Sequence, residues 1–447
     1  MIKLKRLFYV LLFLPLVALG QNGEFTQLNY TCQDGVERPY IIYTPENLDK
    51  NSPKPLLIYL HGAISNPNLK KDPLDYIQKS KLLNLADEGG FYLMFSYGQK
   101  GATWFDEVGT NMVLGQIKNA QQQLSIDSNK IFLSGFSDGA SGVLYFSMIN
   151  PMPFAGFISM NGSLKVAQKL GERGVFPANM NQKPMYIINT TKDLLYPIKQ
   201  IKPVINYLKH YNQNLTFSSP DANHEMSYLE GSEKDNILAF IENNSIQIQK
   251  ELSWETTSLV NTDFNWIAIT KIDTFLTPEH WHVPYQLNVF NDKADFGLKY
   301  DYSFQGKGLK VNDFKSEDCT AKKMGVRNGD IIIMMENDTL HSPYSPYYYI
   351  ATKTAGDSTS LKILRDDNEI TVRGKFNEGY YYEIFDRTTK SAKLITIRED
   401  EKLMIHTSNI TEIKIDFNKL EHKFEEIFIN EKLYPLDSDG VQFIQIK

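Results

Sequence analysis

One stretch of this 447-residue chain decides its fold: Lys130-Ile131-Phe132-Leu133-Ser134-Gly135-Phe136-Ser137-Asp138-Gly139-Ala140-Ser141-Gly142. Its apolar first half predicts a buried strand, and the residues after Gly139 predict a helix that begins at once. Between them, Gly135 to Gly139 fit the pattern G-x-S-x-G. A serine on so sharp a strand-to-helix turn needs glycines where side chains would collide with neighbouring backbone. We therefore predict that Ser137 is a nucleophile, with a helix-capping serine as the alternative.

Around this stretch, short apolar runs alternate with helical patterns from Arg38 to Ser245. Runs that are apolar on both faces predict parallel strands covered by helices on both sides, an α/β fold. The first run ends at Pro45 and is expected to be an antiparallel edge strand. The expected strands are 40–43, 56–60, 91–96, 130–136, 154–160, 185–189 and 215–218; the expected helices are 76–88, 111–124, 139–149, 198–211 and 233–243.

A serine nucleophile needs a base and an acid to orient that base. Asp193 follows a buried run at the carboxyl edge of the sheet, where α/β folds gather their sites; a turn-forming aspartate is the alternative. Asp221 is the rival acid, but it lies three residues before His224, in what we expect to be the same loop. His224, between the last strand and the last helix, is the predicted base. His210 falls within a helical pattern and is expected on the surface or in packing.

An oxyanion hole needs two backbone N–H groups aimed at the developing negative charge. We expect one from Asp138, directly after the nucleophile, and the other from Ala63 in the turn His61-Gly62-Ala63. His61 is itself a candidate base, but its place in this turn favours a structural hydrogen bond. We expect no cofactor and no metal, because the chain has no H-E-x-x-H motif, no cysteine pairs and no phosphate-binding loop.

Composition and the N-terminus bear on the compartment. Apolar residues make up 42% and charged residues 22%, which is typical of a globular protein of two or three domains. A net charge of −6 argues against nucleic-acid binding, which needs a basic surface. Residues 1–20 combine a basic start, a short apolar run and small residues before a possible cut, as in a secretory signal. We therefore expect a secreted or periplasmic protein without a stable membrane span, in which Cys32 and Cys319 stay separate thiols.

Residues 37–245 resemble the α/β-hydrolase serine esterases, in particular the branch with secreted phospholipase/carboxylesterases, feruloyl esterases and polyhydroxybutyrate depolymerases. The resemblance rests on 60–62, 103–106, 135–139 and the loops of Asp193 and His224. It implies an α/β-hydrolase fold with a mostly parallel sheet. It also implies that Trp104 lines the substrate pocket, with a packing role as the alternative. The family often has a glycine before the acid, which this chain lacks.

A second module, residues 296–376, resembles a PDZ domain. Residues 306–311 are similar to the carboxylate-binding loop and the strand after it, and 321–332 to the short helix and Gly-Asp turn. The resemblance implies that the N–H groups at Gly308 and Leu309 hold the C-terminal carboxylate of a peptide that adds as a strand. A module that only packs against the hydrolase is the alternative. The β-rich flanks resemble an accessory region that this module interrupts.

These inferences give a predicted function and a set of domains. We predict an exported serine hydrolase that cleaves a small-molecule or polymer-linked carboxylic ester through an acyl-enzyme. The alternatives are an exported peptidase or amidase with the same triad, and a non-catalytic binding protein that recruits a partner through the PDZ-like module. The predicted parts are a signal peptide (1–20), a catalytic domain (25–246), a β-rich accessory segment (247–295), the PDZ-like domain (296–376) and a β-rich C-terminal segment (377–447).

Overall fold

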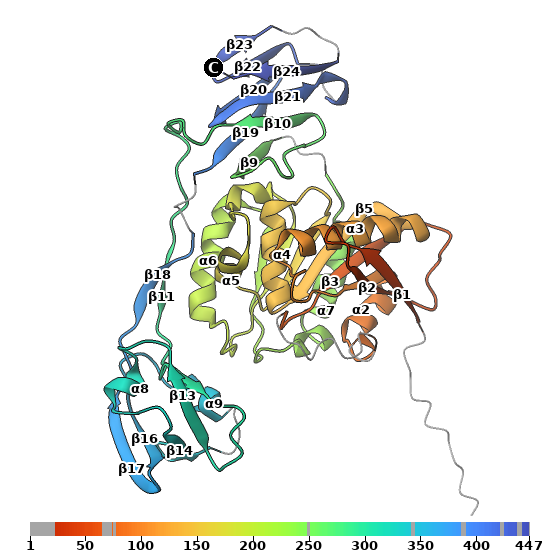
Figure 1. Cartoon of the computed structure of the whole chain (residues 1–447). Coiled ribbons are helices and arrows are strands. Elements are labelled where there is room, and N and C mark those ends of the chain that lie inside the picture. The colour runs from red at the N-terminus through yellow and green to blue at the C-terminus, as the bar shows by residue number, and fades with distance from the viewer. Residues whose placement is uncertain are drawn as a thin grey trace, which may run out of the picture.

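The computed structural model describes residues 23–64, 74, 77–247, 251–340, 345–385, 390–420, 424–435 and 440–446. Figure 1 shows three parts: a central α/β domain, a β-rich unit at one end that includes the C-terminus, and a smaller module beside the α/β domain. The predicted signal at 1–20 lies outside the described residues. Within those residues, no helix is both long enough and apolar enough to cross a membrane.

An eight-stranded sheet forms the centre of the α/β domain, in the order β1-β2-β4-β3-β5-β6-β7-β8. Strands β3 to β8 run parallel to one another, whereas β2 is antiparallel to both β1 and β4. Their carboxyl ends therefore meet at one edge of the sheet. The strands are β1 (Glu24–Thr31), β2 (Glu37–Thr44), β3 (Lys54–Leu60), β4 (Tyr92–Ser96), β5 (Ile126–Phe136), β6 (Gly156–Met160), β7 (Met185–Ile188) and β8 (Leu215–Ser218).

Helices cover both faces of this sheet because neighbouring strand residues point to opposite sides. Ile58 joins the core beneath α3, α4, α5 and α6, and the next residue, Tyr59, joins the core beneath α2 and α7. From β3 to β8, each strand is connected to the next strand in the chain through one of these helices, as parallel strands require. The helices are α2 (Leu82–Gly89), α3 (Glu107–Gln123), α4 (Asp138–Ile149), α5 (Leu164–Leu170), α6 (Ile198–Tyr211) and α7 (Lys234–Asn243).

The structure corrects the expected edge of the sheet. The run 40–43 lies in β2, which is not an edge strand, because β1 pairs with it along its whole length. The edge strand is β1, whose side chains are half-buried or exposed and so carry little apolar signal. The helix expected at 76–88 begins at Leu82, and the seven-residue α5 was not expected.

The two β-rich flanks join into one β unit. Strand β9 (Leu252–Thr256) pairs with β19 (Ala392–Glu399), and β10 (Ile267–Ile272) pairs with β21 (Ile410–Asp416). The two sheets, β23-β22-β20-β19-β9 and β10-β21-β24, share a core that contains Trp254. Segments 247–295 and 377–447 are therefore parts of one unit and not two separate ones. Its other strands are β20 (Lys402–Ser408), β22 (Glu426–Ile429), β23 (Lys432–Tyr434) and β24 (Val441–Gln445).

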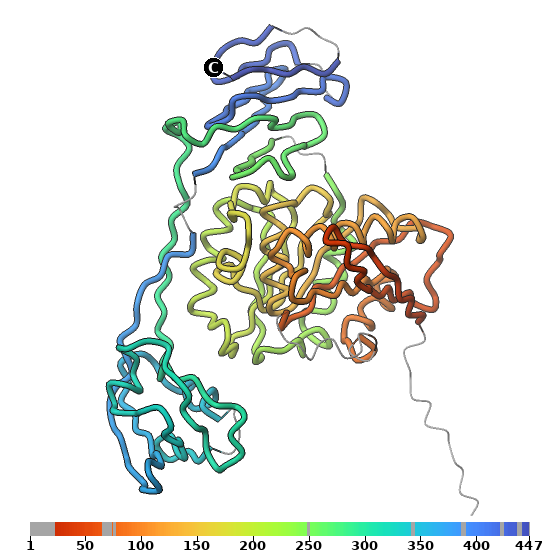
Figure 2. The backbone as a smooth tube through the Cα atoms, viewed as in Figure 1, coloured from red at the N-terminus to blue at the C-terminus, as the bar shows by residue number. Residues whose placement is uncertain are grey.

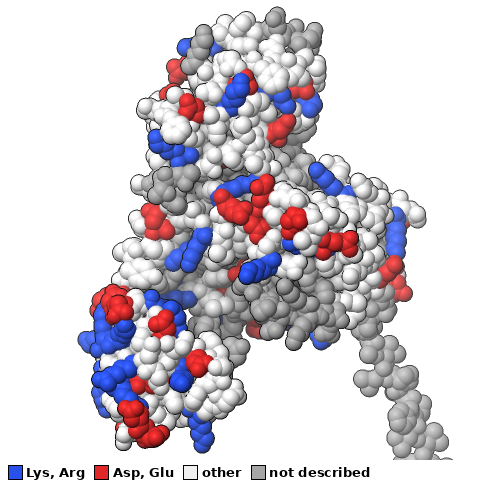
Figure 3. Space-filling model, in the orientation of Figure 1, with Lys and Arg blue, Asp and Glu red and all other residues white. Residues whose placement is uncertain are grey.

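The module between these flanks has its own core, which runs from Ala294 to Phe376. Its sheet has the order β12-β13-β14-β16-β17, with β15 added to β14. Acidic and basic side chains are interspersed over the face shown in Figure 3. The elements are β12 (Leu298–Tyr300), β13 (Leu309–Phe314), α8 (Thr320–Lys323), β14 (Ile331–Met335), β15 (Asp338–Thr339), α9 (Ser345–Ala351), β16 (Ser358–Arg365) and β17 (Asn368–Lys375).

A two-stranded ribbon connects the module to the β unit. It consists of β11 (Asn288–Asn291) and β18 (Tyr380–Glu383), which pair antiparallel. Figure 2 shows the two strands running together along the side of the α/β domain. Val289 and Ile384 join the apolar core of that domain. The ribbon is thus packed against the α/β domain by apolar contacts, and it places the module near the loops at the carboxyl edge of the sheet.

Candidate active site

Ser137 stands on the turn between β5 and α4, in a conformation that amino acids other than glycine rarely adopt. Its φ is +58° and its ψ is −118°. The Ser137 N–H donates to the carbonyl oxygen of Met160 at 3.0 Å, which ties the turn to β6. At Gly139, a Cβ would lie 1.9 Å from the carbonyl oxygen of Leu60. Only glycine fits there, because α4 begins directly against β3.

Three of the predicted site residues form one hydrogen-bonded row. The Nε2 atom of His224 lies 2.9 Å from Ser137 Oγ, and its Nδ1 atom lies 2.7 Å from Asp193 Oδ2. The histidine is partly exposed and the carboxylate is buried. In this arrangement the imidazole can take the serine proton while the carboxylate fixes the ring orientation. The three residues come from the loops after β5, β7 and β8.

Four donors surround the Asp193 carboxylate. Its Oδ1 accepts the N–H groups of Leu195 at 2.8 Å and Tyr196 at 2.9 Å, and its Oδ2 accepts Asn161 Nδ2 at 2.8 Å besides His224. Burial by itself raises the pKa of Asp193. The hydrogen bonds from His224, Tyr196 and Asn161 outweigh burial and hold this pKa below its usual value. The carboxylate is therefore charged at neutral pH.

The rival residues lie outside this row. Asp221 is exposed, and its carboxylate contacts Lys192 Nζ at 2.9 Å and Thr191 Oγ1 at 2.8 Å. It thus clamps the loop after β7 to the loop after β8. His210 lies on the exposed side of α6, against the ring of Tyr211.

The turn after β3 packs directly on the nucleophile. At Gly62, a Cβ would lie 2.9 Å from Ser137 Cβ. Ala63 has a φ of +51°, and the Ile64 N–H donates to Asp138 Oδ2 at 3.1 Å, which fixes the turn against α4. Within the described part of the chain, the N–H groups of Ala63 and Asp138 have no acceptor. Among the described residues, these two N–H groups are therefore open to an acceptor, as the predicted oxyanion hole would need.

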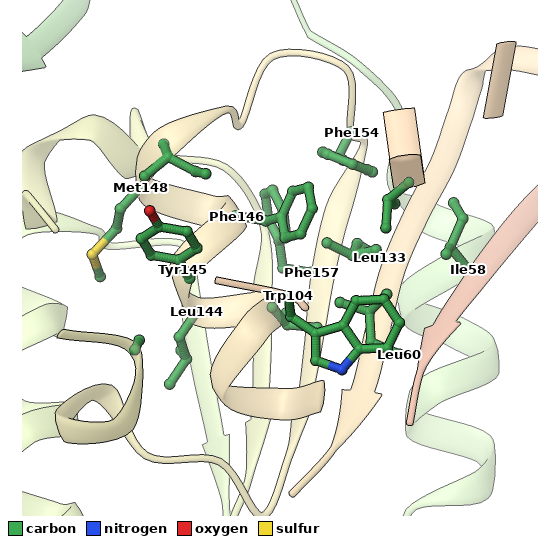
Figure 4. Packing of buried hydrophobic residues seen from close by; sticks show 14 of the residues in the cluster. Ile58, Leu60, Trp104, Leu133, Leu144, Tyr145, Phe146, Met148, Phe154 and Phe157 are labelled. Atoms are coloured by element: carbon green, nitrogen blue, oxygen red, sulfur yellow. The ribbon is translucent and has the colours of Figure 1, made fainter. Parts of the chain in front are cut away.

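The expectation that Trp104 lines the pocket is wrong. Its side chain is 0% exposed, and its Nε1 donates to the carbonyl oxygen of His61 at 2.9 Å. Figure 4 shows its ring inside the apolar cluster with Leu60. The ring nitrogens of His61 lie 2.7 and 3.0 Å from backbone carbonyls, and burial lowers the pKa of this histidine. Both side chains support the turn that carries Ala63 from beneath.

Sequence reasoning missed Asn161 and Tyr196. Asn161 follows β6, is fully buried and has a φ of +56°; its Oδ1 accepts the hydroxyl of Tyr228 at 3.1 Å. The Tyr196 ring lies edge-on to His224, with 5.6 Å between centroids. Burial, with the nearby carboxylates of Asp138 and Asp193, raises the pKa of Tyr196 to about 12. The one sequence signal that could have pointed to Asn161 is its position as a polar residue directly after a buried strand.

Gly308 and Leu309 do not lie at an open sheet edge, which corrects the predicted peptide site. Strand β13 is internal: it pairs with β14 on one side, at Leu309 and Lys310, and with β12 on the other side, from Val311 to Phe314. A Cβ on Gly308 would lie 2.4 Å from the carbonyl oxygen of Ile332. Because β13 lies between β12 and β14, it offers no continuous free edge on which a peptide could add as a strand. Among the described strands, β12 forms the open edge on this side.

A cavity of about 900 Å³ lies between the module and the α/β domain. Asp193 and Leu195 line it from one side, and Ala294, Gly297 and Ile350 from the other. The loop that carries the acid of the hydrogen-bonded row is therefore also a wall of this cavity.

In the part of the chain that the structure describes, no three His, Cys, Asp or Glu side chains gather as a metal site would need. Cys32 and Cys319 are both buried and unpaired.

Comparison with protein families decides the enzyme class. Residues 48–243 match the family model described as phospholipase/carboxylesterase. The chain is a hydrolase of the serine carboxylesterase type. The matched segment spans β3 to α7, so it contains the serine, the aspartate and the histidine of the row. The sheet and its helices are an α/β-hydrolase-type fold, and we call residues 24–243 the hydrolase domain.

Several solved structures resemble half of the chain. A fluorophosphonate-binding serine hydrolase of Staphylococcus aureus is 16% identical, with a TM-score of 0.41, over 49% of this chain and 98% of that one. A Pyrococcus furiosus esterase is 16% identical, with a TM-score of 0.38, over 50% and 94%. A ferulic acid esterase is 12% identical, with a TM-score of 0.37, over 49% and 98%. No curated protein matches the chain.

Proposed function

We propose that this chain is an exported serine hydrolase that cleaves carboxylic esters through an acyl-enzyme, with Ser137, His224 and Asp193 as its triad. The observation that carries the proposal is the row from Ser137 Oγ through the imidazole to the Asp193 carboxylate, at 2.9 and 2.7 Å. These distances are within the range for proton transfer by a positioned base. The strained turn of Ser137 supports the same chemistry, as do the N–H groups of Ala63 and Asp138, which have no acceptor among the described residues.

The reaction follows from these groups in two steps. Ser137 Oγ attacks the ester carbonyl while His224 Nε2 takes its proton, and the N–H groups of Ala63 and Asp138 bind the oxyanion. The imidazolium then gives the proton to the leaving alcohol, and the acyl group stays on the serine. Water enters, gives its proton to His224 and attacks the acyl carbon, which releases the acid and restores the serine. Asp193 stabilises the imidazolium in both steps.

A fluorophosphonate probe tests this assignment, because it forms a bond only with an activated serine. The wild-type chain should be labelled at Ser137 and should hydrolyse a small aryl ester, whereas Ser137→Ala should do neither. The ester turnover should fall by on the order of 10³-fold or more. Ser227→Ala, in the loop of the histidine, is the matched control and should be labelled normally. Full turnover by a folded Ser137→Ala protein would overturn the proposal.

Ester cleavage is favoured over peptide cleavage by the family match, which is to phospholipases and carboxylesterases. The same triad could cleave amides, so the discriminating measurement compares aryl esters with matched aryl amides. Export rests on the signal-like pattern of residues 1–20. Expression of the full chain, followed by N-terminal sequencing of the product outside the cytoplasm, tests that part separately.

A second candidate function is the binding of an extended peptide by the module. Strand β12 has an open edge, which can accept a further strand, and Gly297, directly before β12, lines the cavity together with Ile350. The proposed peptide site is thus at β12 and not at Gly308 and Leu309. Fluorescence anisotropy with a labelled peptide mixture tests it, in the free-carboxylate and the amidated form. Binding that Ile350→Asp does not weaken would contradict this location.

A further inference from the structure

Three consecutive residues from outside the hydrolase domain hold the loop of the triad acid. We call Asn291, Asp292 and Lys293, at the end of β11, the strap. Asn291 Oδ1 accepts Gln200 Nε2 at 2.9 Å, and Asp292 Oδ2 lies 3.4 Å from Lys199 Nζ. These two contacts reach the start of α6, directly after the loop. Asp292 is also 27% exposed on its side chain and Lys199 is 75% exposed, so this ion pair is weak.

The third residue of the strap reaches the loop itself. Lys293 Nζ donates to the carbonyl oxygen of Leu195 at 2.8 Å. That oxygen belongs to the same planar peptide group as the N–H of Tyr196, and this N–H donates to Asp193 Oδ1 at 2.9 Å. One rigid plane therefore has Lys293 at its oxygen and the triad carboxylate at its N–H. An ammonium on the oxygen also polarises the group, which strengthens the hydrogen bond on the other side.

The surroundings of Lys293 suit this contact. Lys293 is an exposed residue, but partial desolvation of its ammonium lowers its pKa, and the negative charge of Asp193 partly opposes that shift. The Leu195 carbonyl replaces part of the water that would otherwise solvate this ammonium. Leu195 is bound on both sides, because its own N–H donates to Asp193 Oδ1 at 2.8 Å. The loop cannot shift without breaking either the lysine contact or a contact to the carboxylate.

We propose that Lys293 is a positioning residue for ester hydrolysis, which acts by fixing the Leu195–Tyr196 peptide group against Asp193. This inference rests on the proposed function, since it assumes that Asp193 orients His224. It adds a requirement that the family match does not cover, because Lys293 lies 50 residues beyond the matched segment, which ends at residue 243. The hydrolase domain thus depends on the ribbon for the geometry of its acid.

The test measures small aryl-ester kinetics on the full chain. Lys293→Met should lower kcat by about 5- to 30-fold and leave KM within about twofold, because a residue that positions the acid affects the chemical step more than substrate binding. Lys293→Arg keeps a cationic donor and should stay within about threefold of wild type. Lys199→Met removes the neighbouring ion pair and should change kcat by less than about twofold. Lys293→Gln is a second variant, which keeps a neutral hydrogen-bond donor. Its loss of kcat should lie between the losses of Lys293→Arg and Lys293→Met.

The same substitution made in an Asp193→Asn variant distinguishes a positioning role of Lys293 from a general effect on protein stability. If Lys293 acts through the acid, Lys293→Met should cause no further loss in labelling rate by a fluorophosphonate once Asp193 is changed. An equal loss in both backgrounds would show a structural effect and overturn the proposal, as would an unchanged kcat in folded Lys293→Met and Lys293→Gln. Failure of the proposed function would look different, since Ser137→Ala would then keep its activity.

Discussion

Asn161 Nδ2 lies 2.8 Å from Asp193 Oδ2, the same oxygen that accepts the ring N–H of His224. The amide stands on the neighbouring strand end, at a positive φ, and is anchored by the hydroxyls of Thr190 and Tyr228. Without this donor, one oxygen of a buried carboxylate would have the imidazole as its single partner. The amide therefore shares the task of keeping the carboxylate ionised and in line with the ring.

We expect Asn161→Ala to lower kcat for an aryl ester by about 10- to 100-fold, because a buried hydrogen bond to a charged group is lost. Asn161→Asp should be worse than Asn161→Ala, because a second carboxylate beside Asp193 disfavours its charged form. Steady-state kinetics on both folded variants checks this order. An aspartate variant as active as the alanine variant would contradict it.

Substitution of the two candidate acids should give unequal losses. Asp193→Asn spoils the orientation of the imidazole and should cost up to about 10⁴-fold in kcat. Asp221→Asn changes only an exposed contact to Lys192 and Thr191, and we expect less than about threefold. Parallel measurement of kcat and of circular dichroism separates activity from folding. The reverse ranking would make Asp221 the acid.

Removal of the module should spare the chemical step. Replacing residues 294–376 by a short Gly/Ser linker keeps Lys293 and the paired ends of the ribbon, Asn291 and Tyr380. Every group that we place in the reaction lies in the hydrolase domain, so small-ester turnover should stay within about tenfold, or roughly 1.4 kcal/mol of barrier. The deletion protein must first be shown to be folded. Collapse of turnover would mean that the module shapes the active site.

Glu255 should stabilise the fold in a pH-dependent way. It is buried, its Oε1 accepts Ser391 Oγ at 2.7 Å and lies 3.2 Å from His282 Nε2, and Lys393 Nζ lies 3.4 Å from its Oε2. Burial raises the pKa of Glu255, but His282 and Lys393 outweigh burial and hold it below its usual value. The stabilisation is therefore present above the unfolded pKa of about 4.3 and is lost as the pH falls through the lower folded pKa.

We expect Glu255→Gln to lower the free energy of unfolding by about 3 kcal/mol at pH 7. The difference from wild type should shrink as the pH falls from about 4.5 to 3. Urea unfolding at several pH values measures both. Glu399→Gln, on the exposed end of β19, is the control and should stay within about 0.5 kcal/mol at every pH. A constant difference across this range would show that the carboxylate charge is irrelevant.

Local pattern was enough to predict the centre of the fold. The strands of the hydrolase domain are apolar on both faces, and the helix predicted at 198–211 has the bounds of α6. The loops of Ser137, Asp193 and His224 could be placed because parallel strands must end at one edge. Strand β1 was missed because its side chains are half-exposed and only its pairing with β2 makes it a strand.

Other errors arose where contacts between residues far apart in the sequence determine the position of a side chain or a strand. Trp104 lies beneath the oxyanion turn and not above it, and the residue type is equally compatible with both positions. In the module, Gly297 and Gly308 both have positive φ and both precede a strand. Only the pairing of the sheet shows that the second of these strands is internal. Asn161 finds its carboxylate partner 32 residues away, so no local spacing marks it.

The interrupted β unit sets an order in which the chain can fold. Strand β9 ends at Thr256 and its partner β19 begins at Ala392, so their pairing must close a loop of 135 intervening residues. Closing so long a loop is entropically costly and slow. Once the module has formed its own core, the ribbon already holds Asn291 beside Tyr380, and the remaining open chain is far shorter. We therefore expect the module to fold before β9 and β19 pair, because its core shortens the loop that this pairing has to close.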